Sequence, residues 1–173
     1  MIRFSVATVA AAVVMAASSA FAQAVTDPQI AAIVVTANQV DIDAGKVAAA
    51  KGTHPEVKAF GKQMAADHAG VNKQATALVT KLGVKPEDNP TAQSLKAGGA
   101  DNVKKLTGLS GAAFDKAYID NEVTYHQQVL DALDKTLIPN AKNAELKALL
   151  EKVRPAFVAH LNQAQTIQKA LSK

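Results

Sequence analysis

The chain has 173 residues, a formal charge of +4 and no cysteine, and 49% of its residues are hydrophobic while only 4% are aromatic. The length fits one globular domain, the hydrophobic fraction excludes a disordered chain, and the missing cysteines exclude disulfides, thiolate metal sites and a cysteine nucleophile. Lysines lie scattered along the sequence, so the small positive charge gives no focused phosphate-binding surface and nucleic acid is not an expected partner. Because aromatic residues are few and alanines many, we predict an all-α fold rather than a β-sandwich or barrel.

The first residues have the layout of a secretory signal peptide. Arg3 supplies one positive charge, an uncharged apolar stretch begins at Phe4, and an Ala-x-Ala site ends at Ala22. This layout predicts cleavage after Ala22, which leaves residues 23–173 as the mature domain and places the protein in the periplasm or outside the cell. An uncleaved membrane anchor is the alternative, because the uncharged run approaches the length that spans a bilayer. No later segment is apolar enough to span one, so we expect no transmembrane segment after cleavage.

The next residues predict two helices joined by a short turn. The first helix begins at Asp27-Pro28, where the aspartate is a capping side chain and the proline fits the first helical position. It ends at Gly52, a residue type that favours helix C-termini. The second helix begins at Thr53, which is expected to form a capping box with Glu56, and it continues to residue 82.

Two further helices form a second predicted hairpin. The third helix begins near residue 112 and ends before Pro139. Asp115 falls in its first turn, where a carboxylate interacts favourably with the helix dipole. The fourth helix runs over 142–171 with Pro155 inside it, and the backbone hydrogen bond lost at this proline predicts a kink.

The apolar residues of these helices recur in alternating steps of four and three. In the second helix they fall on one stripe with a single histidine: Val57, Gly61, Met64, His68, Val71, Ala75, Leu78 and Leu82. This spacing keeps residues on one helix face and is typical of helices packed at shallow angles in a bundle. The connection 84–111, with short helical pieces predicted within 91–106, is long enough to run back along such a bundle. The predicted fold is a ferritin-like four-helix bundle, two helical hairpins joined by a long crossover.

Three of the four histidines lie on these apolar stripes, one each on the second, third and fourth helices: His68, His126 and His160. Asp41 takes the comparable position on the first helix. Counted from each turn at ~1.5 Å per residue, Asp41 and His68 differ in depth by about 4.5 Å, and His126 and His160 by about 7.5 Å. Glu122, one turn before His126, could bridge the larger offset. Each helix therefore offers one polar group to the interior.

This pattern has two interpretations. Imidazole and carboxylate groups that converge inside a bundle suit a first-row transition metal. The candidate ligands are Asp41, His68, Glu122, His126 and His160. Alternatively, the histidines only form internal hydrogen bonds with nearby carboxylates and tyrosines. The usual di-iron pattern, a Glu-x-x-His on each of two helices, is missing, because Ala65 and Phe157 occupy the glutamate positions, so ferroxidase chemistry is not expected.

The sequence also resembles a known family. The matching elements are Asp41-Ile42-Asp43-Ala44-Gly45-Lys46-Val47-Ala48, Val57-Lys58-Ala59-Phe60, Met64-Ala65-Ala66-Asp67-His68, Phe114-Asp115-Lys116-Ala117-Tyr118 with His126, and Pro155 with His160-Leu161. In combination they resemble an exported bacterial ferritin-like family, whose members are called domain-of-unknown-function proteins and are often labelled predicted outer membrane or exported proteins. Asp41 stands where that family usually carries glutamate. The resemblance covers nearly the whole mature chain and implies a ferritin-like bundle in the cell envelope, without a settled activity.

These observations leave two functional hypotheses. In the first, the chain is an exported envelope protein of unsettled activity whose interior residues bind a transition-metal ion. In the second, it is a structural or stress-associated bundle that binds no metal and acts through its surface. The sequence contains no phosphate-binding loop and no recognisable Ser, His and Asp arrangement for nucleophilic catalysis. We therefore name no catalytic residue and no protein partner, and leave open the identity of the metal, the oligomeric state and whether the chain is an enzyme.

Overall fold

The computed structural model describes residues 25–172, and over these residues the chain folds into helices with no strand. The helices are α1 (Asp27–Lys51), α2 (Pro55–Lys81), α3 (Pro90–Thr107), α4 (Gly111–Ala132), the π-helix η1 (Leu133–Leu137), α5 (Ile138–Asn140) and α6 (Ala144–Leu171). The predicted all-α class is confirmed. The predicted signal peptide, residues 1–22, lies outside the described residues. Within the described part, no helix combines the length and the hydropathy that crossing a membrane requires.

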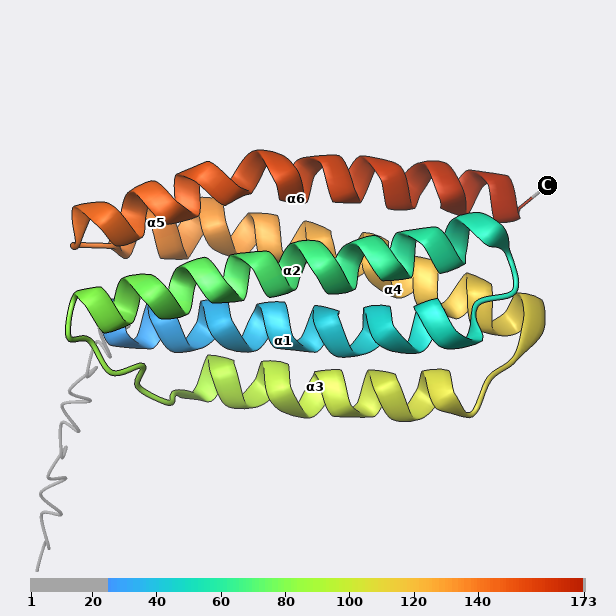
Figure 1. The fold of residues 1–173 in the computed structure, drawn as a ribbon, viewed down its shortest axis with the longest axis horizontal. Coiled ribbons are helices and arrows are strands. Elements are labelled where there is room, and N and C mark those ends of the chain that lie inside the picture. The colour runs from blue at the N-terminus through green and yellow to red at the C-terminus, as the bar shows by residue number, and fades with distance from the viewer. Residues whose placement is uncertain (1–24, 173) are drawn as a thin grey trace, which may run out of the picture.

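The helices pack as two hairpins with one further helix against their side (Figure 1). α1 pairs with α2 and α4 pairs with α6, and the two pairs meet where α2 contacts α6 and α1 contacts α4. α3, which connects the pairs, runs along the outer side of α1. The interior is therefore lined by α1, α2, α4 and α6.

The connection between the hairpins is more regular than predicted. Instead of short helical pieces within 91–106 it forms one helix, α3, with Asn89 as its N-cap and Pro90 at its start. Gly99 packs against α1, where an added Cβ would lie 2.6 Å from a methyl carbon of Val40. The missing side chain thus lets the two helices approach closely. In the sequence this glycine looks like a helix breaker, because its packing partner lies on a distant segment.

The predicted cap of α1 is wrong. Thr26 caps the helix, in a capping box with Gln29. The Asp27 carboxylate instead accepts hydrogen bonds from the backbone N–H groups of Lys142 and Asn143, at 2.8 Å each. Asp27 therefore fixes the turn that precedes α6 rather than the start of its own helix.

The predicted cap of α2 is wrong in a similar way. Nδ1 of His54, rather than the Thr53 hydroxyl, accepts from the backbone N–H of Glu56. The buried Asp115 carboxylate on α4 accepts from the backbone N–H groups of Thr53 and His54, at 2.9 and 2.8 Å, and from the Thr53 hydroxyl. Asp115 has a structural role, as expected, but it fixes the α1–α2 turn. Each hairpin turn is thus held by an aspartate of the opposite hairpin.

The second hairpin turn lies later in the chain than predicted. The helix continues from α4 through η1 and Pro139 to Asn140, and α6 begins only at Ala144. Counted from the middle of this turn at ~1.5 Å per residue, His126 and His160 differ in depth by about 3 Å instead of about 7.5 Å. The position of the turn therefore brings these two histidines nearly level, and α6 runs unbroken through its internal proline.

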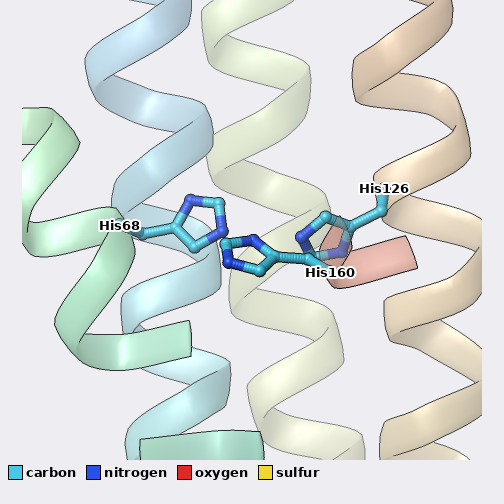
Figure 2. A group of neighbouring side chains, drawn as sticks. All are labelled: His68, His126 and His160. Atoms are coloured by element: carbon cyan, nitrogen blue, oxygen red, sulfur yellow. The ribbon is translucent and has the colours of Figure 1, made fainter. Parts of the chain in front are cut away.

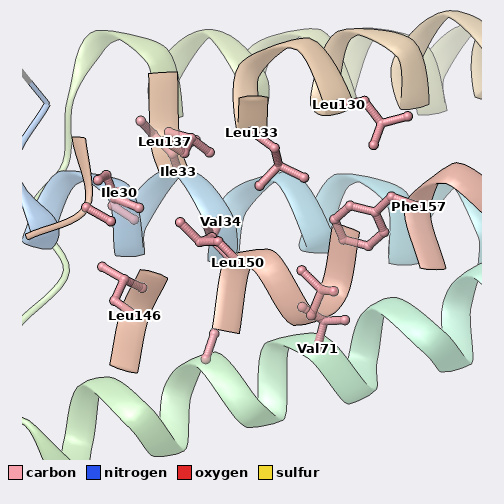
Figure 3. Packing of buried hydrophobic residues seen from close by; sticks show 14 of the residues in the cluster. Ile30, Ile33, Val34, Val71, Leu130, Leu133, Leu137, Leu146, Leu150 and Phe157 are labelled. Atoms are coloured by element: carbon pink, nitrogen blue, oxygen red, sulfur yellow. The ribbon is translucent and has the colours of Figure 1, made fainter. Parts of the chain in front are cut away.

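Two apolar clusters fill the interior on either side of a polar layer. The first includes Ile30, Val34, Leu133, Leu150 and Phe157 (Figure 3), and the second includes Val57, Phe60, Met64, Phe114 and Tyr118. Along α1, α2 and α4, the buried polar residues Asp41, His68 and Glu122 lie between the segments that contribute to the two clusters. Burying polar groups costs stability unless they find partners. The two apolar clusters supply the stability that keeps this layer buried.

Candidate metal centre

Four helices each present a buried polar side chain to the middle of the interior. Asp41 on α1, His68 on α2, His126 on α4 and His160 on α6 are each at most 3% exposed. The three imidazoles converge from three helices (Figure 2), and one donor nitrogen from each lies within 4.8 Å of the others. Their ring centroids are 5.4 or 5.5 Å apart. Residues on separate apolar stripes therefore share one site.

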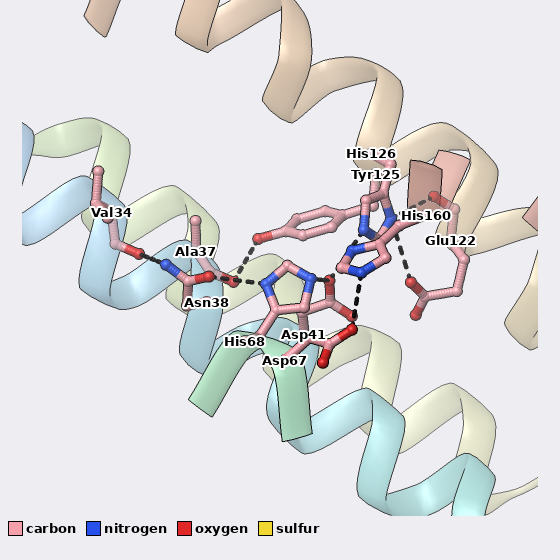
Figure 4. A network of polar contacts seen from close by, with 10 residues as sticks. All are labelled: Val34, Ala37, Asn38, Asp41, Asp67, His68, Glu122, Tyr125, His126 and His160. Carbon is pink, nitrogen blue, oxygen red and sulfur yellow. Dashed lines mark hydrogen bonds and ion pairs between the residues drawn. The ribbon is translucent and has the colours of Figure 1, made fainter. Parts of the chain in front are cut away.

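Each imidazole has one ring nitrogen held by an oxygen atom (Figure 4). The three pairs are His68 Nδ1 with Asn38 Oδ1 at 2.7 Å, His126 Nδ1 with the backbone carbonyl of Glu122 at 3.0 Å, and His160 Nε2 with Asp67 Oδ2 at 3.0 Å. Amide, carbonyl and carboxylate oxygens only accept hydrogen bonds, so the nitrogen that faces each of them carries the proton. In a neutral ring, the other nitrogen then has a free lone pair.

The two side-chain acceptors differ in burial. Asn38 is buried, and its amide nitrogen donates to the backbone carbonyl of Val34 at 2.8 Å, which turns the amide oxygen toward His68. The Asp67 side chain is 46% exposed, so the partner of His160 lies at the surface. One imidazole is therefore held from within the core, and another is held from the solvent side of α2.

The three remaining ring nitrogens are buried without a hydrogen-bond partner in the described residues: Nε2 of His68, Nε2 of His126 and Nδ1 of His160. Oδ2 of Asp41 lies 2.8 Å from Nε2 of His68 and 3.5 Å from Nε2 of His126, so this carboxylate forms an ion pair with either ring when that ring is protonated. A buried polar group without a partner costs about 1–3 kcal/mol. A cation bound between these atoms would satisfy them together.

Asp41 and Glu122 form the acidic side of the site. With His126 they make a second group whose ligand atoms lie within 4.8 Å of one another. Burial raises the pKa of Glu122 well above its ordinary value, and the charge of Asp41 raises it further. Burial also raises the pKa of Asp41, but attraction to the His68 and His126 rings outweighs it and leaves that pKa below its ordinary value. The pair therefore favours a state in which Asp41 is ionised and Glu122 keeps its proton.

His160 is biased toward its neutral form. Burial lowers its pKa, and repulsion from the His68 and His126 rings lowers it further, although Asp67 acts in the opposite direction. Metals bind neutral imidazole, because protonation removes the lone pair that forms the bond. The environment of His160 thus favours the protonation state that a metal ligand needs.

The two tyrosines near the site have core roles. Tyr125 donates from its hydroxyl to the backbone carbonyl of Ala37 at 2.8 Å, and its ring lies edge-on to His126. Tyr118 is fully buried in the second apolar cluster. Burial and the nearby carboxylates raise the pKa of Tyr118 well above its ordinary value, so its hydroxyl stays protonated.

The structure brings together all five side chains selected from the sequence: Asp41, His68, Glu122, His126 and His160. Their role as metal ligands remains a prediction. Sequence reasoning missed two outer partners, Asn38 and Asp67, which hold imidazoles in place. Asn38 could have been found from its position in the sequence, because it stands one helical turn before Asp41. The fourth histidine, His54, lies outside the site as the N-cap of α2.

Three imidazoles with an adjacent carboxylate form a donor set for a first-row transition metal. Imidazole nitrogen suits Zn, Cu, Fe and Ni, and its second nitrogen is commonly bound by a carboxylate, carbonyl or water that fixes the ring. The site shows that outer arrangement around each of its three rings. It differs from the usual di-iron pattern, since no Glu-x-x-His lies on α2 or α6.

The chain belongs to the family described as Domain of unknown function (DUF4142), whose match covers residues 11–167. The match spans the described helices almost to the end of α6. No curated protein and no solved structure matches the chain closely enough to show a relationship. The family assigns no activity, so the function has to be inferred from the site.

Proposed function

We propose that this chain is an exported cell-envelope protein that binds a first-row transition-metal ion inside a ferritin-like four-helix bundle. The ligands are the free nitrogens of His68, His126 and His160 and the carboxylate of Asp41, with Glu122 beside them. The observation that carries the proposal is the set of three buried ring nitrogens that converge from three helices. Internal hydrogen bonding accounts for one nitrogen of each ring. Among the inward nitrogens, Nε2 of His68 has the Asp41 carboxylate at 2.8 Å, while Nε2 of His126 and Nδ1 of His160 have no hydrogen-bond partner in the described residues.

The outer partners support the same conclusion. In each ring, the nitrogen turned away from the centre faces an oxygen acceptor, so each ring is set in the tautomer that points a lone pair inward. A site built only for internal hydrogen bonding would place a donor against each inward nitrogen. Here the inward neighbours are two other imidazoles and the Asp41 carboxylate.

The ferritin-like arrangement rests on helix pairing. Two hairpins, α1 with α2 and α4 with α6, are joined by a connection that runs the length of the molecule as α3. A bundle with one long crossover is the topology of ferritin-like folds, which build metal sites from side chains on facing helices. The buried polar layer occupies the corresponding mid-bundle position.

A metal titration tests the proposed site. The exported chain, purified without an affinity tag and stripped with a chelator, is titrated with Zn, Cu, Fe and Mn by calorimetry near pH 7.5. At least one metal should bind and raise the melting temperature, because a ligand of the folded state stabilises it by mass action. Affinity should fall below pH ~6.5, where protons compete for imidazole.

Histidine variants locate the binding. His68→Ala and His160→Ala should abolish both binding and the metal-dependent rise in melting temperature. His54→Asn is the matched control, since His54 lies outside the site and asparagine is a good N-cap residue. Absence of binding with all four metals, or equal binding by native and His68→Ala chains, would overturn the proposal. The alternative, a structural bundle that acts through its surface, would then be favoured.

Export is a separate part of the proposal. The signal-peptide layout of residues 1–22 supports it, and intact-mass analysis of protein from the periplasm or medium tests it. The mature chain should begin at Gln23. A mass that retains Met1 to Ala22 would contradict cleavage and favour a membrane anchor.

A further inference from the structure

A pocket of about 110 Å³ is lined by residues of α1, α3, α4, η1 and α6, together with His68 of α2. Its walls are mainly aliphatic and aromatic side chains: Ile33, Leu133, Leu137, Leu150, Val153 and Phe157. These belong to the first apolar cluster or pack against it, and several are labelled in Figure 3. The pocket is thus an unfilled part of the apolar core.

Two polar residues of the pocket wall, Tyr125 and Asn38, have their hydrogen-bonding atoms engaged by other groups. The Tyr125 hydroxyl donates to a backbone carbonyl of α1. The Asn38 amide donates to its own helix, and its oxygen faces Nδ1 of His68 (Figure 4). Water needs about two to four polar partners to occupy a cavity stably. The pocket therefore offers poor hydration and favours an apolar occupant.

The pocket has an identifiable structural origin and a way in. Two small side chains in its wall, Ala37 and Ala132, leave space between α1 and α4, and the π-helical turn η1 begins directly after Ala132. π-Helical turns joined to α-helices are frequent at functional sites. At the mouth stand two exposed side chains, Thr91 of α3 and Gln128 of α4. α3 packs chiefly on α1 and contacts α4 little, which leaves these two exposed residues as a route into the pocket.

We infer that this pocket is a binding site for a neutral apolar molecule of about the size of benzene. An apolar cavity of ~150 Å³ lined by Leu, Ile and Phe is known to bind benzene or xenon, and this pocket has similar walls and a volume of the same order. Charged or strongly polar molecules are disfavoured, because burying them without hydrogen-bond partners is costly. The inference stands without a bound metal.

The pocket also touches the wall of the candidate metal centre. His68 and Phe157 both line it, and their rings stack with centroids 5.1 Å apart and an interplanar angle of 12°. A molecule in the pocket would therefore contact this ring pair. NMR signals of the His68 ring should report its binding directly.

The test uses the chelator-treated full-length mature chain with benzene as the probe. Benzene should raise the melting temperature in a saturable way, and pyrimidine, a polar ring of similar size, should not. Ala132→Leu should abolish the benzene effect by filling the pocket. Ala117→Leu is the matched control, because Ala117 is a half-buried alanine of the same helix and does not line the pocket, so this variant should keep the effect.

NMR of the native chain gives a readout that does not depend on the variants folding. Benzene should shift signals of pocket residues, including His68 and Leu133, and leave the distant second cluster unchanged. Shifts spread over the surface, no saturable shift, or equal thermal effects in the native and Ala132→Leu chains would overturn the inference. Because metal is removed throughout, failure of benzene binding leaves the proposed metal site standing, and failure of metal binding leaves the pocket standing.

Discussion

The Asp115 carboxylate on α4 accepts a hydrogen bond of 2.8 Å from the backbone N–H of His54, the residue that caps α2. It also accepts from the backbone N–H of Thr53 at 2.9 Å. The Asp27 carboxylate of α1 likewise accepts two hydrogen bonds from backbone N–H groups in the turn before α6. Both aspartates connect one hairpin to the other, so they fix how the hairpins are docked as well as where a helix starts.

Removing the Asp115 carboxylate should therefore destabilise the fold. Asp115→Ala leaves two backbone donors without their acceptor, and the expected loss in the free energy of unfolding is about 1–3 kcal/mol, measured by urea denaturation. Asp115→Asn should lose less, because the amide oxygen still accepts. Asp101→Ala, at an exposed position of α3, is the control and should change little. Equal effects of Asp115→Ala and Asp101→Ala would contradict the docking role.

Close packing of α1 against α2 depends on two glycines. A Cβ on Gly61 would lie 2.7 Å from Cβ of Ala48 and 2.8 Å from the backbone oxygen of Gly45. Gly61→Ala should therefore push the helices apart and lower the free energy of unfolding by about 1–3 kcal/mol. Gly70→Ala, on the same helix with nothing within 4 Å, should raise it by about 0.5–1 kcal/mol. Thermal or urea unfolding of both variants checks the opposite signs.

The buried faces of the helices could be predicted from the spacing of apolar residues within each helix. His68 and Met64 stand on one stripe of α2 because steps of four and three return to the same side of a helix, and both are buried. The same reasoning placed Asp41 toward the interior of α1. These positions depend on the spacing within one helix, so they were accessible without knowledge of how the helices pack.

Features that depend on distant segments were not predicted. The hydrogen-bond partners of Asp27 are Lys142 and Asn143, more than a hundred residues away in sequence. The local sequence therefore predicted that Asp27 caps the nearest helix. Gly99 looks like a breaker until Val40 is placed beside it. The outer partner of His68, Asn38, likewise lies on another helix. Tertiary contacts decided these roles, and helix propensity alone gives no signal for them.

The ion pair between η1 and α6 predicts a small pH dependence. Asp134 accepts two hydrogen bonds from Arg154, at 2.6 and 2.7 Å, and these lower the pKa of Asp134 below its ordinary value of 3.8. A lowered pKa in the folded state stabilises the fold above the ordinary value, and that stability is lost as the pH falls through the folded pKa. Asp134→Asn should therefore lower the melting temperature slightly at pH 7.

The effect of Asp134→Asn should be small because both side chains are 41% exposed and solvent screens the pair. Melting temperatures of the native and variant chains, measured from pH 7 down to about pH 2, should converge at the acid end. A difference that stays constant down to the lowest pH would show that the substitution acts through something other than the charge of Asp134.

Asn38 should act on metal binding through His68. Asn38→Leu removes the acceptor that sets the His68 tautomer, and loss of such an outer partner typically lowers metal affinity by about 10–100-fold. Asn72→Leu is the matched control, because Asn72 is a half-buried asparagine on α2 that donates to the backbone carbonyl of Val35, outside the site. Calorimetric titration should show weaker binding only for Asn38→Leu. A loss of equal size in both variants would point to general destabilisation.

The last prediction separates metal binding from internal hydrogen bonding without adding metal. Nε2 of His126 is buried without a hydrogen-bond partner. In the metal-free protein this unsatisfied polar group lowers the stability of the fold.

His126→Leu, a substitution of similar volume, should leave the free energy of unfolding about unchanged in chelator at pH 7.5, because removal of the unpaired Nε2 offsets the lost attraction between this ring and Asp41. Metal binding should be lost at the same time. Leu150→Ala deletes most of a fully buried side chain and is the reference for lost core packing. It should lower the free energy of unfolding by about 2–5 kcal/mol in the same urea denaturation. If the histidines serve only as internal hydrogen-bonding residues, His126→Leu should instead lower the free energy of unfolding, because Asp41 and Glu122 would lose a polar partner in the core.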